Sequence, residues 1–158
     1  MPAKLKTSIS KPALKKTNVS GKTLEEVSKK LDKLPAWGKY DCEIKYSYKT
    51  DASGNVTEVT LTGKPVITMP IWKEWSKGDR ESQKKWDIMW VKLKRHEEEH
   101  HNKTLGEIKK LEAKMKKAKS LSEKDFKKMM DQFYKDLSKA QKDYDKKSDH
   151  GKKEGVKL

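Results

Sequence analysis

The spacing of apolar residues predicts two long helices in the second half of the chain. The first begins near Gly78 and Asp79, and one of its faces is apolar: Trp86, Met89, Trp90, Leu93, Ile108, Leu111 and Met115. The second begins after Ser120 or Ser122 and repeats apolar residues at steps of three and four: Phe126, Met130, Phe133, Leu137, Ala140 and Tyr144. This spacing suits antiparallel packing of the two helices.

The first half of the chain shows a different period. Residues 42–49 alternate between apolar and polar side chains, which predicts a half-buried strand. A turn at Asp51 to Asn55 leads into a return strand that begins at Val56, and residues 66–69 form a third extended piece. A short helix begins after Thr23, with Glu26 completing a capping box, and ends before Pro35. We therefore expect an α+β fold, with a small antiparallel sheet of about three strands beside the two long helices.

Composition divides the chain into one domain and two flanking segments. The length of 158 residues suits a single domain. Residues 1–17 are rich in Lys and contain no acid, so we expect a flexible basic arm there, ending in a short strand near Thr17 to Ser20. The domain itself is expected to span residues 18–151, and residues 152–158 form a C-terminal tail.

The net charge of +15 comes almost entirely from Lys, since Arg occurs only at Arg80 and Arg95. Dispersed Lys is typical of a solvated surface, whereas readers of nucleic acid favour the bidentate guanidinium of Arg. Binding to nucleic acid or to an anionic surface is therefore the less favoured interpretation. The lone Cys42 excludes an internal disulfide. Neither a membrane-spanning segment nor a signal peptide is visible, and we expect a monomer.

The most informative motif is His-Glu-Glu-Glu-His at residues 96–100, inside the first long helix. His96 and His100 are four residues apart, so their imidazoles lie on one helical face and can reach a single Zn²⁺ ion. That face is also the apolar one, which directs both ligands into the protein. Glu97 is placed to take a proton from a metal-bound water, as a general base. His101 points roughly 100° away from His100 and is a poor ligand candidate.

A catalytic zinc site needs a third protein ligand. We favour His150, which lies in a polar segment after the second helix, and Asp145 is the alternative. Tyr144 could then contact a developing oxyanion. The competing interpretations are a non-catalytic zinc-binding protein, in which the metal only stabilises the fold, and a basic interaction module.

Several blocks, in this order, resemble a bacterial family of predicted secreted zinc-dependent proteases that is catalogued as a domain of unknown function. The blocks lie at residues 18–27, 44–48, 68–72, 86–100 and 144–151, of which the last two are the specific ones. The resemblance implies a zincin-like metallopeptidase acting on protein or peptide substrates in a secreted or periplasmic location. It also implies that the His-Glu-Glu-Glu-His motif supplies two ligands and the base, and that His150 is the family's late histidine.

Two positions depart from the family pattern. The family often has Gly before the second histidine of the motif and Thr in the terminal block, whereas this chain has Glu99 and Ser148. Ser148 keeps the hydroxyl group, and Glu99 adds a charge near the site. The departures therefore concern rate and specificity more than metal ligation.

Overall fold

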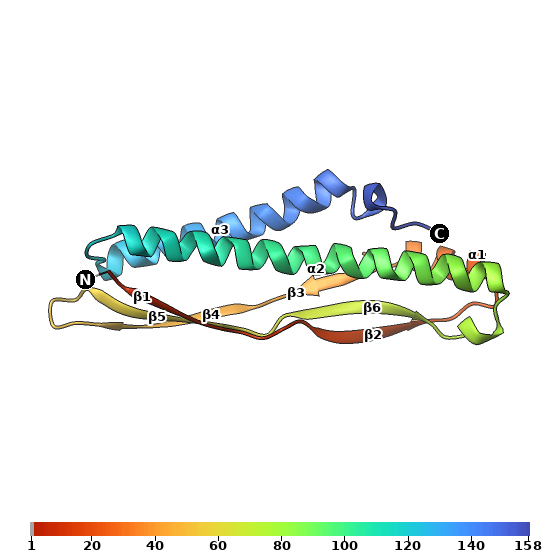
Figure 1. Cartoon of the computed structure of the whole chain (residues 1–158), viewed down its shortest axis with the longest axis horizontal. Helices are drawn as coiled ribbons and strands as arrows, with labels where there is room; N and C mark the ends of the chain where they lie inside the picture. Colours follow the sequence, from red (N-terminus) through yellow and green to blue (C-terminus); the bar gives the residue numbers. More distant parts are fainter. Residues whose placement is uncertain (1) are drawn as a thin grey trace. The chain divides into compact units, whose positions relative to one another are not determined.

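The computed structural model describes residues 2–158 and confirms the α+β class (Figure 1). Within those residues the chain forms two three-stranded sheets and three α-helices, two of them long. The elements follow in the order β1 (Lys4–Ile9), β2 (Ala13–Val19), α1 (Leu24–Asp32), β3 (Lys39–Asp41), β4 (Ile44–Thr50), β5 (Val56–Gly63), β6 (Val66–Trp72), η1 (Trp75–Lys77), α2 (Arg80–Lys117), α3 (Glu123–Ser148) and η2 (Lys152–Glu154).

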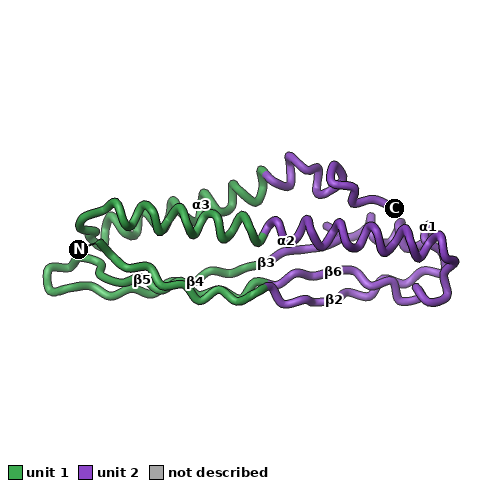
Figure 2. Tube along the Cα trace, viewed as in Figure 1, with its two compact units in different colours: residues 1–11, 42–65, 101–143 green, residues 12–41, 66–100, 144–158 purple. Residues whose placement is uncertain are grey.

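The chain divides into two compact units, each built from three separate segments (Figure 2). Unit 1 contains the residues up to 11 together with 42–65 and 101–143. Unit 2 contains residues 12–41, 66–100 and 144–158. The boundary crosses α2 after His100 and α3 before Tyr144, so each long helix contributes residues to both units.

Unit 1 is a sheet in the order β1-β5-β4 with helical segments packed on it. β5 pairs in parallel with β1 and antiparallel with β4, and the turn between β4 and β5 is the predicted hairpin, with Gly54 at a φ of 81°. Its core joins apolar side chains of the sheet with those of α2 and α3: Val59, Leu61, Leu111, Met115, Phe126 and Met130. The predicted stripes of the two long helices therefore contribute to one shared core in this unit.

Unit 2 repeats the same strand arrangement in the order β2-β6-β3, with β6 parallel to β2 and antiparallel to β3. Its core joins α1 and the first half of α2 to β6: Val27, Leu31, Met69, Trp72, Met89 and Leu93. Two tryptophan side chains are also hydrogen-bonded, from Trp72 Nε1 to the Gly21 carbonyl at 2.8 Å and from Trp90 Nε1 to the Pro70 carbonyl at 2.9 Å. This core fixes the first half of α2, which carries the histidine motif.

The predicted helix starts are confirmed by their capping hydrogen bonds. The Thr23 hydroxyl accepts from the Glu26 backbone N–H at 3.2 Å, Asp79 accepts from Ser82 at 2.7 Å, and Ser122 accepts from Asp125 at 3.1 Å. Within residues 2–158 no helix has the length and apolar character required to cross a membrane.

The expectation of one antiparallel sheet and a flexible arm at residues 1–17 is wrong. That segment holds β1 and most of β2, and residues 66–69 belong to β6, which joins the second sheet instead of extending the β4–β5 hairpin. Both N-terminal strands are edge strands, where exposed lysines are compatible with pairing and discourage aggregation. The Lys-rich composition of residues 1–17 therefore reflects the edges of two sheets and not disorder.

Candidate metal centre

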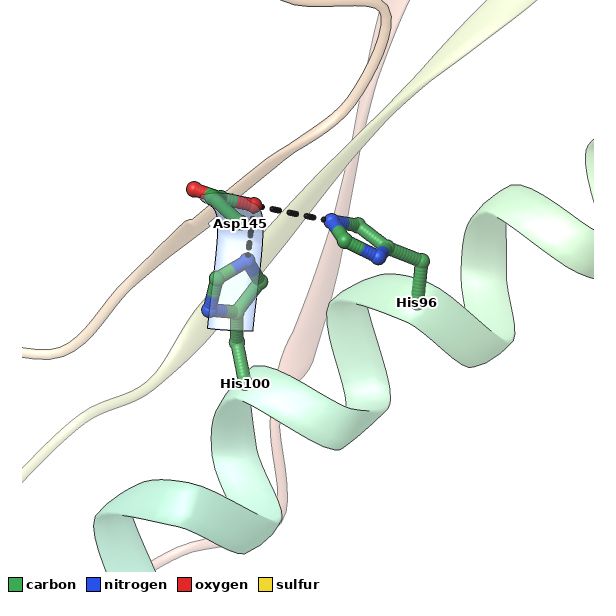
Figure 3. A group of neighbouring side chains, drawn as sticks. All are labelled: His96, His100 and Asp145. Carbon is green, nitrogen blue, oxygen red and sulfur yellow. Dashed lines mark hydrogen bonds and ion pairs between the residues drawn. The ribbon is translucent and has the colours of Figure 1, made fainter. Parts of the chain in front are cut away.

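His96 and His100 lie on successive turns of α2 and both point at the carboxylate of Asp145 (Figure 3). The Asp145 Oδ1 atom is 3.0 Å from Nε2 of His96 and 2.9 Å from Nε2 of His100. Both histidines are buried, with 3% and 6% of their surface exposed, whereas the Asp145 side chain is about one-third exposed. All three residues belong to unit 2. The structure therefore brings the Asp145 oxygen to two histidines that lie 45 and 49 residues before it in the sequence.

The three donor atoms fit a divalent metal ion. They lie within 4.8 Å of one another, and two of the separations are close to 3 Å. Tetrahedral zinc, with bonds of about 2.0–2.1 Å, holds neighbouring donor atoms about 3.3 Å apart. The two separations that involve Asp145 are shorter than this by a few tenths of an ångström, so the carboxylate would need to draw back slightly to admit an ion. Two imidazoles and one carboxylate are also a common ligand set for zinc.

Aromatic rings enclose the two histidines. The Tyr144 ring stacks on His96, with centroids 4.8 Å apart and planes 24° apart, and the Tyr40 ring from β3 lies nearly parallel to His100 at 6.2 Å. These contacts limit rotation of both imidazoles. They also remove water from part of the site, which strengthens electrostatic interactions there.

Glu97 is the buried acid of the predicted motif, with 4% of its surface exposed. Burial raises the pKa of Glu97 to about 7; His100 opposes this change, and the carboxylates of Asp145 and Asp41 add to it. A Cβ atom placed on Gly38 would lie 3.3 Å from Glu97 Cγ, so glycine leaves room for the Glu97 side chain at this point. A carboxyl group in this environment is suited to exchange protons near neutral pH.

The structure places His150 beside the group of three but not in it. Its side chain is 74% exposed, and its Nδ1 atom is 3.9 Å from Asp145 Oδ1. The His150 backbone lies in the left-handed region at φ 52°, and its N–H donates to the Asp145 carbonyl, which helps to end α3. Whether His150 or Asp145 is the third ligand stays a prediction. Of the two, Asp145 is the residue whose oxygen lies within hydrogen-bonding distance of both imidazoles.

Tyr144 lies at the site, but its hydroxyl group already has a hydrogen-bond partner. It donates to Glu154, at 2.7 Å to Oε2 and 2.9 Å to Oε1. Burial and this carboxylate raise the pKa of Tyr144, so the hydroxyl stays protonated. Its proposed contact with an oxyanion would require exchange of that partner.

Glu154 is the site residue that sequence reasoning missed. Its Oε1 atom is 2.7 Å from Nδ1 of His96, on the side of the ring opposite to Asp145. We had expected residues 152–158 to form only a tail, yet they include this residue and the buried Val156 of unit 2. The sequence does contain one indication of its role, because Glu154 is the only acidic residue after Gly151 and lies in the short segment between Gly151 and Gly155.

A comparison with protein families gives one match. The family model described as a bacterial protein of unknown function (DUF922) matches residues 14–151. This confirms the expected bacterial family of unknown function, and the description assigns no activity to it. No curated protein and no solved structure matches the chain.

Proposed function

We propose that this chain, which belongs to the bacterial family of unknown function DUF922, is a zinc-dependent peptidase. The observation that carries the proposal is the convergence of two buried imidazoles and one carboxylate beside a second, buried carboxyl group. In this proposal His96, His100 and Asp145 hold the metal and Glu97 is the general base. His150 is the alternative to Asp145 as third ligand, because its imidazole lies close to the Asp145 carboxylate.

A zinc ion bound there would supply a Lewis acid for a carbonyl group and would lower the pKa of a water ligand toward about 7. The residues of the chain would do the remaining work. Glu97 would accept the proton of the attacking water and return it to the leaving amine, and burial raises its pKa to about 7, where both transfers are balanced. Tyr144 would contact the developing oxyanion after releasing Glu154.

β3 supports an extended peptide as the substrate. It is an edge strand in the order β2-β6-β3, and its residue Tyr40 packs against His100. An extended peptide can add to such an edge by main-chain hydrogen bonds, which would hold its backbone next to the metal ligands. A secreted or periplasmic location belongs to the same proposal and is supported only by the family resemblance.

The test is to measure zinc content and peptide hydrolysis on the same samples. We expect the wild-type protein to bind about one zinc ion and to cleave unfolded protein substrates. Glu97→Gln should keep the zinc and lose hydrolysis, whereas Glu98→Gln, one residue further along α2 with a half-exposed side chain, should retain both.

Three results would count against parts of this proposal. Hydrolysis retained in Glu97→Gln would remove Glu97 as the base. Zinc bound by the wild type without hydrolysis of any peptide would favour a non-catalytic zinc-binding protein. A wild-type protein that binds no zinc would refute the metal centre itself.

A further inference from the structure

We infer that Glu154 is a positioning residue. Its contact with Nδ1 orients the His96 ring for metal binding and connects the C-terminal turn to the site. This inference rests on the proposed metal centre. The carrying observation is the pair of contacts on the two nitrogens of one imidazole. Nδ1 of His96 meets Glu154 Oε1 at 2.7 Å, while Nε2 meets Asp145 at 3.0 Å.

The contact with Glu154 selects one tautomer of His96. A neutral imidazole carries one N–H, and each nitrogen of His96 faces a carboxylate. The contact with Glu154 is the shorter of the two, 2.7 Å against 3.0 Å to Asp145, so we assign the proton to Nδ1. With Nδ1 protonated, the lone pair available to a metal is that of Nε2, which already points toward Asp145 and the site. Carboxylates that accept the second N–H of a ligand histidine fix its ring in this way and increase its basicity.

Glu154 also holds the ring that packs on His96. Both of its oxygens accept from the Tyr144 hydroxyl, and the Tyr144 ring stacks on the His96 ring at 4.8 Å. The imidazole is thus held at its edge by a carboxylate and on its face by an aromatic ring that the same carboxylate fixes. The Tyr144 ring also packs edge-on against His100 at 4.9 Å, whereas the hydrogen bond from Nδ1 to Glu154 is made by His96.

The turn that carries Glu154 is built to reach this position. Gly151 and Gly155 flank η2 with φ values of 90° and 91°, which strongly favour glycine. A Cβ atom on Gly151 would lie 2.8 Å from Val156 Cγ2 and 3.3 Å from His96 Cγ, so the turn packs directly on the ligand ring. Val156, 4% exposed, anchors the segment in the core of unit 2. Glu154 itself lies beyond the family match at residues 14–151.

The test compares zinc affinity and the protonation of His96 nitrogens in the full-length protein. The variants are Glu154→Ala, Glu154→Gln and Lys153→Ala, the last being an exposed change in the same turn. Zinc affinity is measured by competition with a chelating dye, and the protonated nitrogen is identified by long-range ¹H–¹⁵N correlation spectra. Spectra are recorded for the zinc-loaded protein and for the metal-free protein at about pH 8, a working condition above the ordinary range of histidine.

We expect Glu154→Ala to bind zinc about 10–100-fold more weakly, the range seen for loss of such outer carboxylates. Glu154→Gln should recover part of the affinity, because its amide oxygen still accepts from Nδ1–H, and Lys153→Ala should match the wild type. The Nδ1–H signal of His96 should be present in the wild type and lost or exchange-broadened in Glu154→Ala. Partial rescue by Gln is a result that general loosening of the turn would not give.

The outcomes separate this inference from the proposed function. Unchanged zinc affinity and an unchanged Nδ1–H signal in Glu154→Ala would overturn the role of Glu154 while leaving the zinc centre intact. If the wild type binds no zinc, the metal centre falls, and the metal-free spectra still decide whether Glu154 holds His96 in its Nδ1–H form. If Glu154→Ala does not fold, the comparison of Glu154→Gln with Lys153→Ala decides: equal affinities and equal spectra would overturn the inference.

Discussion

The ionisation of Glu97 should make the free energy of unfolding of the metal-free protein depend on pH. Burial raises the pKa of this side chain from 4.5 to about 7. Each unit of difference between the folded and unfolded pKa is worth about 1.4 kcal/mol, so the full effect is roughly 3–4 kcal/mol. The replacement Glu97→Gln removes the ionisable group and keeps nearly the same size.

The direction follows from which state binds the proton. Below about pH 4.5 the carboxyl group is protonated in both the folded and the unfolded chain, so it adds no pH dependence. Between about pH 4.5 and 7 the unfolded chain loses this proton while the folded chain retains it, which favours unfolding. The free energy of unfolding of the wild type should therefore fall by roughly 3–4 kcal/mol relative to Glu97→Gln across this range and level off above about pH 7.

Urea unfolding followed by tryptophan fluorescence measures this difference, with a chelator present at every pH. Glu98→Gln is the matched control, because its carboxylate is 53% exposed and ion-paired at 3.9 Å with Lys94. Its difference from the wild type should stay within about 1 kcal/mol at every pH, as expected for a surface pair. A difference between wild type and Glu97→Gln that does not change with pH would show that burial does not hold the proton on Glu97.

Three further outcomes are expected. Gly151→Ala should destabilise the protein in urea unfolding by more than Gly54→Ala. Both glycines have a positive φ, a backbone conformation that costs other residues about 1–2 kcal/mol. A Cβ atom at Gly151 would in addition lie 2.8 Å from Val156, whereas a Cβ atom at Gly54 would have nothing within 4 Å. Equal losses in the two variants would argue against close packing of the C-terminal turn. Phe126→Ala should lower the free energy of unfolding by about 3–5 kcal/mol, because this side chain is fully buried, and a loss below about 1 kcal/mol would contradict the core of unit 1. Zinc at about 100 times its dissociation constant should add about 2.7 kcal/mol to the free energy of unfolding, and His100→Ala should lose most of this gain. The same gain in His100→Ala, measured by denaturation with and without zinc, would exclude this histidine as a ligand.

The helices and the pair of histidines were predictable because they depend on local spacing. The step between His96 and His100 places two imidazoles on one face of any helix, and the apolar residues around them determine that the face is buried. The start of α3 follows in the same way from Ser122 and the stripe that begins at Phe126. These features require no knowledge of distant parts of the chain.

The strands β1 and β2 and the role of Glu154 were not predictable because they depend on distant partners. β1 and β2 are stabilised by parallel pairing with β5 and β6, and nothing local in their Lys-rich sequences reveals those partners. The position of Glu154 depends on two left-handed glycines and on burial of Val156, which are tertiary features of a turn that reads as a polar tail. The sequence favours His150 over Asp145 because it is the remaining non-adjacent histidine and lies in a polar segment, whereas the course of the chain at the end of α3 brings the Asp145 oxygen to both imidazoles.

The division of unit 2 into three segments explains why its C-terminal end matters to the site. The two imidazoles belong to residues 66–100, while Asp145 and Glu154 belong to residues 144–158. In the structure these segments are joined at the site by the hydrogen bonds of His96 and His100 and by the burial of Val156. An ion bound by ligands of both segments would close a loop of 45 residues between His100 and Asp145, and closing a long loop restricts the unfolded chain most. Metal binding and docking of the C-terminal segment are thus coupled, because each brings together the same residues.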